Sequence, residues 1–199
     1  MTTLEAPLTI RFDSAFMLAH RIHRGQARKG SQIPYIAHVM GVAALVLEYG
    51  GNETEAIAAL LHDAIEDAPA DMGAQGVRRE IGDTFGEEVL AIVEHCTDTD
   101  VQPKPPWQER KAAYVAAVQH APLFALRVSA ADKFHNVRSL IRDYRSVGEK
   151  LWARFNPEAG KSGTLWYYRS LADVFKDRMP GPLADDLDRA VSTLEALTG

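Results

Sequence analysis

Apolar residues recur about every 3.6 positions along almost the whole chain, which is the period of an α-helix. No stretch alternates between apolar and polar residues as a half-buried strand does. The pattern predicts an all-α fold of about 8 to 10 helices. The segments with the clearest helical period are residues 13–25, 35–50, 53–67, 84–96, 107–120, 122–144, 164–178 and 182–198.

Three short motifs predict where individual helices begin or end. A polar residue followed three positions later by Glu is typical of a capping box, and paired glycines are typical of a helix end. The motifs are Asn52 with Glu55, Thr84 with Glu87, and the pair Gly50-Gly51.

Length and composition set limits on the class of protein. The 199 residues suit a single domain over 1–199, and the net charge of -5 disfavours a nucleic-acid-binding protein. No apolar run is long enough to span a membrane, and the N-terminus lacks the pattern of a signal peptide. Cys96 is the only cysteine, so we expect no disulfide within the chain and a cytoplasmic location.

The most informative segment is His62-Asp63-Ala64-Ile65-Glu66-Asp67, which places four ionisable groups beside an apolar run. Unpaired buried charge is costly, so such a cluster indicates a use for it. His62 and Asp63 can supply two ligands to a divalent metal. Glu66 and Asp67 can hold and deprotonate a water molecule.

Two further residues are candidates for the same metal. His38 lies near the start of a predicted helix, and Asp132 lies midway along another. Together with His62 and Asp63 they form a mixed imidazole and carboxylate set. Such a set suits Mn²⁺, Fe²⁺ or Zn²⁺ better than Ca²⁺ or Mg²⁺, and the pattern therefore predicts metal-assisted hydrolysis.

These residues stand at the spacing of the HD superfamily of metal-dependent phosphohydrolases. The surrounding motifs resemble the hydrolase domain of the Rel/SpoT alarmone enzymes, and a chain with only that domain is similar to the small alarmone hydrolases related to the metazoan SpoT homologue. The motifs are Gly25-Gln26-x-Arg28-Lys29, Pro34-Tyr35-Ile36-x-His38, Ala58-Ala59-Leu60-Leu61-His62-Asp63-x-x-Glu66-Asp67, Phe85-Gly86 and Ala131-Asp132-Lys133-x-x-Asn136.

The resemblance implies an HD-type helical bundle with its core at roughly 10–145 and a helical extension over 146–199. It implies that a Mn²⁺ ion, or another divalent metal, supports removal of the 3′-pyrophosphate from ppGpp or pppGpp. The roles that it implies are metal ligands for His38, His62, Asp63 and Asp132, a catalytic pair in Glu66 and Asp67, and substrate contacts for Arg28, Lys29 and Asn136.

Tyr35 and Lys111 are further candidates for substrate binding, the first by stacking on a base and the second by contact with phosphate. The chain departs from the family at Val39, where Pro is usual, and at Ser129, where Lys is usual. Other substrates, such as ppApp, NADPH or a deoxynucleotide, therefore stay open as alternatives. A sensor that binds alarmone without cleaving it is a third reading, and the chain could also form a homo-oligomer.

Overall fold

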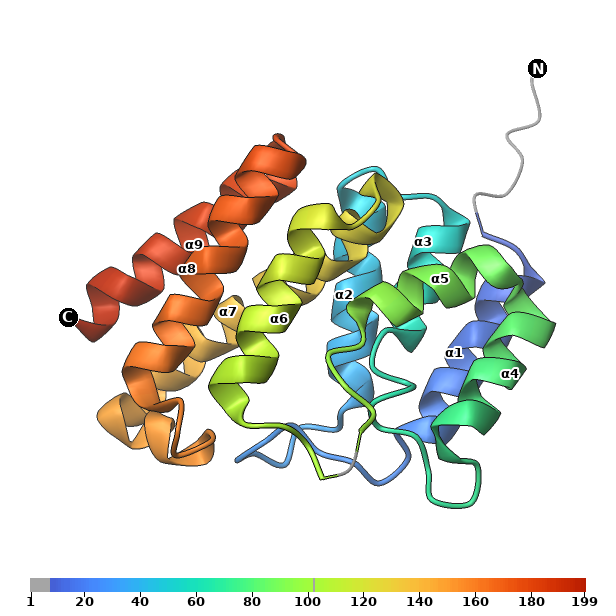
Figure 1. Ribbon diagram of the computed structural model, residues 1–199, viewed down its shortest axis with the longest axis horizontal. Helices are drawn as coiled ribbons and strands as arrows, with labels where there is room; N and C mark the ends of the chain where they lie inside the picture. The colour runs from blue at the N-terminus through green and yellow to red at the C-terminus, as the bar shows by residue number, and fades with distance from the viewer. Residues whose placement is uncertain (1–7, 102) are drawn as a thin grey trace. The chain divides into compact units, whose positions relative to one another are not determined.

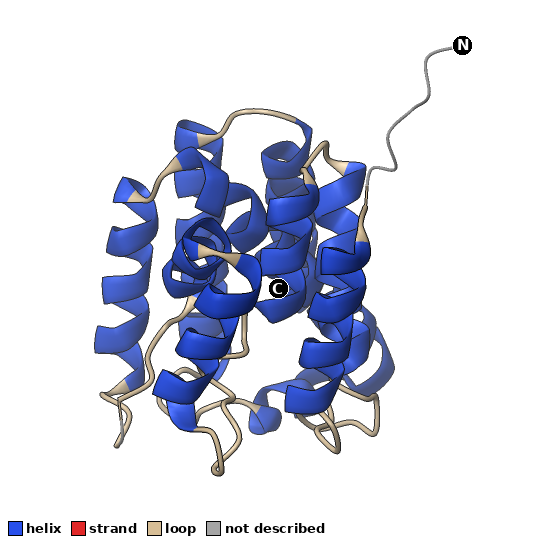
Figure 2. Cartoon of the chain, turned by 90° about the vertical axis from the view of Figure 1, so that its right-hand side faces the viewer, coloured by secondary structure: helices blue, strands red, loops and turns tan. Residues whose placement is uncertain are grey.

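The computed structural model describes residues 8–101 and 103–199 of the chain. Within these residues the regular structure is helical and contains no strand (Figure 1; Figure 2), so the expected all-α fold is confirmed. The helices are α1 (Ile10–Ile22), α2 (Ile36–Glu48), α3 (Glu53–Leu61), α4 (Gly73–Phe85), α5 (Glu87–Cys96), α6 (Trp107–His120), α7 (Leu123–Val147), the 3₁₀ helix η1 (Gly148–Arg154), α8 (Gly160–Arg178) and α9 (Pro182–Thr198).

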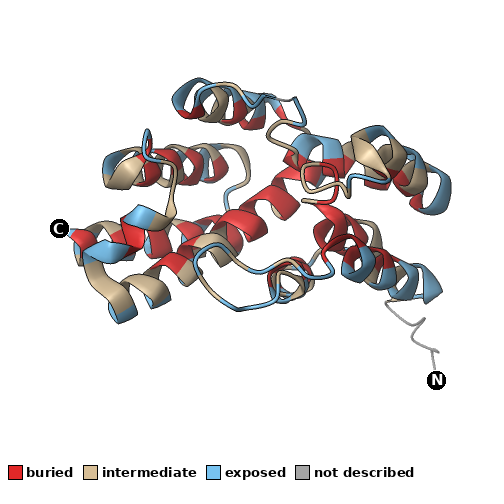
Figure 3. Cartoon of the chain, turned by 90° about the horizontal axis from the view of Figure 1, so that it is seen from below, coloured by how far each residue is buried: buried red, intermediate tan, exposed pale blue. Residues whose placement is uncertain are grey.

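The chain divides into two compact units, one that ends at Thr97 and one that runs from Asp98 to Gly199. The first contains α1 to α5, and the second contains α6 to α9 with η1. Figure 3 shows buried residues in stripes along the helices, with exposed residues on the opposite faces. The predicted boundary between an HD core and an extension at 145/146 stays a prediction.

Helix α3 is the central helix of the first unit and packs against α1, α2 and α5. Every residue from Ala56 to Leu61 is at most 1% exposed. Its N-terminus carries the predicted capping box: Asn52 Oδ1 accepts from Glu55 N–H at 3.0 Å, and Glu55 Oε2 accepts from Asn52 N–H at 2.9 Å. The box satisfies two of the backbone groups that a buried helix end leaves without partners.

Helix α3 ends at Leu61, whereas the periodicity predicted a helix to residue 67. The Ala64 N–H donates to Leu61 O, three residues back, and Asp67 N–H donates to Asp63 O, four residues back. Residues 62–67 therefore form tight turns rather than a regular helix. The prediction was wrong here because apolar spacing continues through Ala64 and Ile65 although the backbone tightens.

Helix α4 was not expected, because its glycines weaken the helical pattern. Its buried residues Val77, Ile81 and Phe85 follow at intervals of four, which is the signal that could have identified it. The predicted capping box of Thr84 with Glu87 was wrong. Thr84 lies inside α4, and the residue before α5 is Gly86, which makes no side-chain cap.

In the second unit, the 25-residue α7 packs against α8, α9 and η1. Arg169 of α8 joins α9 through hydrogen bonds of 2.6 Å to Asp188 and 2.7 Å to Glu195. Helix α7 also buries three polar residues, Ser129, Asp132 and Lys133, on the stretch where Asp132 was predicted as a ligand. In the part of the chain that the structure describes, no helix is both long and apolar enough to cross a membrane.

Substitutions at Gly76, inside α4, and at Gly86, directly after it, test the assigned bounds of this helix. Gly86 has φ +89° and ψ 166°, a conformation that essentially only glycine adopts, so Gly86→Ala should destabilise the chain by about 1–3 kcal/mol. Gly76 lies inside α4, where an added Cβ would meet Met72 at an ordinary 3.5 Å. Gly76→Ala should therefore stabilise the chain by about 0.5–1 kcal/mol. Urea unfolding measures both, and an equal effect of the two changes would contradict the assignment.

Candidate metal and catalytic site

Asp63 is the residue on which the predicted site of the first unit converges. The Tyr35 hydroxyl donates a 2.5 Å hydrogen bond to Asp63 Oδ2. His62 Nε2 lies 3.1 Å and His38 Nε2 lies 3.6 Å from the same oxygen. Both imidazoles are 1% exposed, and Asp63 retains 21% of its side-chain exposure. The structure thus brings three of the predicted ligands, and Tyr35, to one carboxylate oxygen.

The two histidines present their ring nitrogens to a common point. Their ring centroids lie 5.1 Å apart at 73°, and each offers a nitrogen within 4.8 Å of the other. His62 Nδ1 lies 2.7 Å from Ala59 O. Because a carbonyl oxygen can only accept, Nδ1 carries a proton. In the neutral ring, Nε2 then holds the lone pair and directs it toward Asp63.

This donor set fits a divalent cation. His62 Nε2 and Asp63 Oδ2 would repel each other as two lone pairs 3.1 Å apart, and a cation between them would remove that repulsion. Buried imidazole nitrogens beside a carboxylate are a common ligand set for divalent metals of the first transition series. The hydrogen bond from Nδ1 to a backbone carbonyl is the usual way in which such a histidine is oriented.

Hydrogen bonds within the basic loop after α1 hold its two sides together, and Tyr35 follows the loop at this site. Its two sides pair, since Arg28 N–H donates to Ile33 O at 2.8 Å and Tyr35 N–H donates to Gln26 O at 2.9 Å. Ser31 closes the tip through a 3.0 Å bond from its hydroxyl to Arg28 O. The Arg28 guanidinium lies 5.9 Å from the Tyr35 ring centroid, while Lys29 is exposed near the tip.

Glu66 and Asp67 lie in the turns that follow Asp63, and both are half-buried. Asp67 Oδ2 lies 3.9 Å from Nδ1 of His23, a buried histidine that our sequence reading missed. Burial lowers the pKa of His23, while a hydrogen bond to Gln26 acts in the opposite direction. The signal that could have identified His23 is its place two residues before Gly25-Gln26 and the basic pair.

In the second unit, the carboxylate of Asp132 is held from both sides. Lys133 Nζ donates to Oδ2 at 2.5 Å, and Asn136 Nδ2 donates to Oδ1 at 2.6 Å. Burial lowers the pKa of Lys133, but Asp132, Tyr114 and Tyr167 together raise it by more, so the net shift is well upward. Lys133 therefore stays charged, and it is a second residue whose part the sequence reading missed.

Lys111 lies on α6 and contacts a different carboxylate. Its Nζ donates to Asp98 at 2.6 Å and lies 4.8 Å from the centre of the Tyr167 ring. Lys133 lies 6.0 Å from the same ring. Within the second unit, Tyr167 therefore lies next to both the predicted phosphate contact and the residue that holds Asp132.

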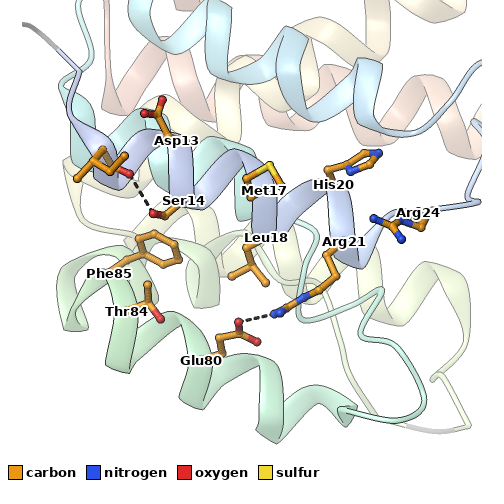
Figure 4. Close-up of a pocket in the computed structure, with 11 residues that line it drawn as sticks. Asp13, Ser14, Met17, Leu18, His20, Arg21, Arg24, Glu80, Thr84 and Phe85 are labelled. Carbon is orange, nitrogen blue, oxygen red and sulfur yellow. Dashed lines mark hydrogen bonds and ion pairs between the residues drawn. The ribbon is translucent and has the colours of Figure 1, made fainter.

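The first unit also has a hollow of about 520 Å³ between α1 and α4 (Figure 4). Leu18 and Phe85 point into it, and Arg21 reaches across to form an ion pair with Glu80. None of the described residues that line it was predicted for the site. The predicted ligands of the first unit therefore gather around Asp63 and do not line this hollow.

Comparison with known proteins identifies the family of the chain. The family model for the HD domain matches residues 15–165. A Xenopus tropicalis protein named guanosine-3′,5′-bis(diphosphate) 3′-pyrophosphohydrolase MESH1 is 38% identical over 123 residues, which cover 60% of this chain and 64% of the relative. The mouse protein of that name is 36% identical over 133 residues, which cover 65% of this chain and 69% of the relative.

Relatives in bacteria are larger. A GTP pyrophosphokinase of Streptomyces coelicolor is 31% identical over 181 residues, which cover 85% of this chain but 20% of that protein. The chain therefore spans less than two thirds of the frog relative and a fifth of this bacterial one.

Solved structures share the fold. The structure of a metazoan orthologue of SpoT matches 98% of this chain and 99% of its own with a TM-score of 0.74 and 22% identity. A Listeria monocytogenes protein matches 78% of this chain and 96% of its own with a TM-score of 0.65 and 29% identity. By the family match and by the mouse relative, this chain belongs to the HD domain family, in the group that includes the metazoan SpoT homologues.

Proposed function

We propose that this chain is a metal-dependent pyrophosphohydrolase that removes the 3′-pyrophosphate from (p)ppGpp, giving GDP or GTP and pyrophosphate, and so lowers the alarmone signal. The observation that carries the proposal is the convergence of Tyr35, His38 and His62 on Asp63, directly before a carboxylate pair. The frog and mouse relatives, 38% and 36% identical, are named for this activity.

The metal would be held by His38, His62, Asp63 and Asp132. The family match over residues 15–165 includes all four, and Lys133 and Asn136 fix the Asp132 carboxylate in one orientation. We assign a single Mn²⁺, because a mixed imidazole and carboxylate set suits this ion, and other divalent metals fit the same donors. Such an ion supplies an activated water and neutralises negative charge on phosphate.

Glu66 and Asp67 would act as the general base and general acid of the reaction. A half-buried Glu66 can accept a proton from the attacking water, and Asp67 can orient that water or pass a proton to the leaving oxygen.

Substrate contacts would come from five residues. Arg28 and Lys29 on the paired loop would bind the pyrophosphate, Arg28 with two parallel hydrogen bonds. Tyr35 would stack on a base beside them. Lys111 would exchange its bond to Asp98 for one to phosphate, and Asn136 would line the nucleotide pocket.

One observation keeps another nucleotide as the second candidate substrate. Ser129 stands where the family usually has Lys, and its Oγ lies 2.8 Å from the Tyr114 hydroxyl. This position therefore carries no positive charge for a phosphate. The loss of that charge leaves the identity of the nucleotide open, so ppApp or NADPH is the second candidate, and binding without cleavage would identify a sensor.

A panel of purified nucleotides tests the proposal. The full chain, loaded with Mn²⁺, should convert ppGpp to GDP and pyrophosphate, with both products identified by anion-exchange chromatography. Faster cleavage of ppApp or NADPH would assign the second candidate instead. The cytoplasmic location and a homo-oligomer stay predictions, and we propose no partner beyond the nucleotide.

Activity should require the divalent metal. Excess chelator should abolish hydrolysis, and added Mn²⁺ should restore it. His62→Ala and Asp63→Ala should each lose the bound metal, as measured by plasma mass spectrometry, because each removes a donor. His95→Ala, which changes an exposed histidine of α5, is the control and should keep both metal and activity. Full turnover of a metal-free protein would contradict this prediction.

Removing either basic residue of the loop should weaken substrate binding. Arg28→Ala and Lys29→Ala should each raise KM by about 10- to 100-fold, since a hydrogen bond to a charged group contributes about 1.5–3 kcal/mol. The metal content should not change. Arg24→Ala, at an exposed position just before the loop, is the matched control. Loss of metal with an unchanged KM would show that the loop was assigned the wrong role.

The double change Glu66→Gln/Asp67→Asn should separate binding from catalysis. General acid and base groups contribute about 10²–10⁴-fold, so kcat should fall by at least that range. Both substitutions are nearly isosteric, so metal content and nucleotide affinity, measured by calorimetry, should stay close to wild type. A normal kcat in the metal-loaded double variant would show that these carboxylates have no part in catalysis.

A further inference from the structure

His23 follows α1, lies outside the proposed ligand set and contacts two residues next to that set, Tyr35 and Asp67. It caps the C-terminus of α1 through a 3.0 Å bond from its backbone N–H to Ala19 O. Its side chain is completely buried. Nδ1 lies 2.7 Å from Gln26 Oε1 and 3.9 Å from Asp67 Oδ2. The buried ring therefore has one nitrogen that faces two oxygen atoms.

The surroundings of His23 select one tautomer. The atoms near Nδ1, an amide oxygen and a carboxylate, are both hydrogen-bond acceptors. Nε2 is buried and has no hydrogen-bond partner among the described residues. A proton on Nε2 would leave a buried donor unsatisfied, which is costly, whereas a proton on Nδ1 donates to Gln26 and faces Asp67. Burial also lowers the pKa of His23, which favours the neutral ring with a single proton.

The same ring supports Tyr35. The His23 and Tyr35 ring centroids lie 4.9 Å apart at 33°, and the Tyr35 hydroxyl donates to Asp63. One imidazole thus contacts the residue that holds Asp63 and also faces the carboxylate of Asp67. These are the two ends of the segment that carries the proposed chemistry.

We infer that His23 is a positioning residue for Asp67, acting through an Nδ1–H group whose tautomer Gln26 fixes. The inference rests on the proposed function, because it gives Asp67 a part in catalysis. The 3.9 Å separation is longer than a hydrogen bond, and catalytic hydrogen bonds often tighten only when the substrate is bound. Nδ1–H would then turn from Gln26 toward Asp67 and hold one carboxylate oxygen, so that the other faces the reacting groups.

Substitution of His23 by two amides separates this role from simple packing. An Asn side chain places its amide near the position of Nδ1, and a Gln side chain places it near Nε2. All three of His23→Ala, His23→Asn and His23→Gln lose the ring that packs against Tyr35. Any difference between Asn and Gln therefore reports the Nδ1–H group.

We expect His23→Ala and His23→Gln to lower kcat by about 10- to 100-fold, the usual cost of losing a group that orients a ligand or a base. KM and metal content should stay near wild type, and His23→Asn should recover most of kcat. The same changes at His20, which is exposed three residues earlier on α1, are the control and should have no effect. Equal losses in the Asn and Gln variants, or a loss confined to KM or to metal content, would overturn the inference.

The tautomer can be measured without any substrate. In ¹⁵N-labelled full chain, with Zn²⁺ as a diamagnetic ion and again without added metal, long-range ¹H–¹⁵N spectra should show His23 protonated at Nδ1. The signal is assigned by its loss in His23→Asn, and it should shift in Asp67→Asn if the two side chains interact. A proton on Nε2, or a signal that Asp67→Asn leaves unchanged, would overturn the inference.

The two proposals fail in different ways. If the wild-type chain cleaves no nucleotide, the proposed function fails and this inference fails with it. If the wild-type chain hydrolyses ppGpp while the Asn and Gln variants lose activity equally, only the role of His23 is wrong.

Discussion

The cost of burying imidazole and carboxylate groups beside an apolar helix controls the arrangement of the first unit. Helix α3 is almost fully buried, and His62 and Asp63 follow it directly, so their polar atoms need partners. Tyr35 supplies a hydroxyl to Asp63, and Ala59 O accepts from His62. The contact between His62 Nε2 and Asp63 Oδ2 is the one that a cation would satisfy best. A bound metal ion would therefore offset part of the cost of burying these groups, so it would stabilise the fold as well as serve the proposed reaction.

Because α3 ends at Leu61, the turns of residues 62–67 can place Asp67 away from α3. In a regular helix, Asp67 would follow Asp63 along one face and stay close to α3. The tightened turns after Leu61, followed by Pro69, instead bring Asp67 within 3.9 Å of His23 at the end of α1. The ends of two helices thus lie close to the proposed catalytic pair. Side chains on turns between buried helices can be both half-exposed to substrate and held by a rigid frame.

Local motifs with a direct chemical meaning were predictable from the sequence, and features that depend on packing were not. Asn52 forms its capping box because the hydrogen bonds join residues three apart. The pairing of Thr84 with Glu87 has the same pattern, but α4 runs through Thr84 and the positive φ of Gly86 separates the two helices. The place of His23 before Gly25-Gln26 could have marked it as a candidate, but the sequence could not give its contacts, because Asp67 and Tyr35 are 44 and 12 positions away along the chain.

In the second unit, the buried ion pair of Lys133 and Asp132 also needs contacts that offset the cost of its burial. A buried ion pair is costly to desolvate and is retained only when further contacts support it. Lys133 has such contacts, because its ammonium lies 4.8 Å from the Tyr114 ring centroid and donates to Asp132. Asn136 donates to the other carboxylate oxygen, so both oxygens of Asp132 are held by protein donors. If Asp132 binds a metal as proposed, the nearby Lys133 ammonium would weaken the attraction between the carboxylate and the ion. The contacts that orient the carboxylate would then also lower its affinity for the metal.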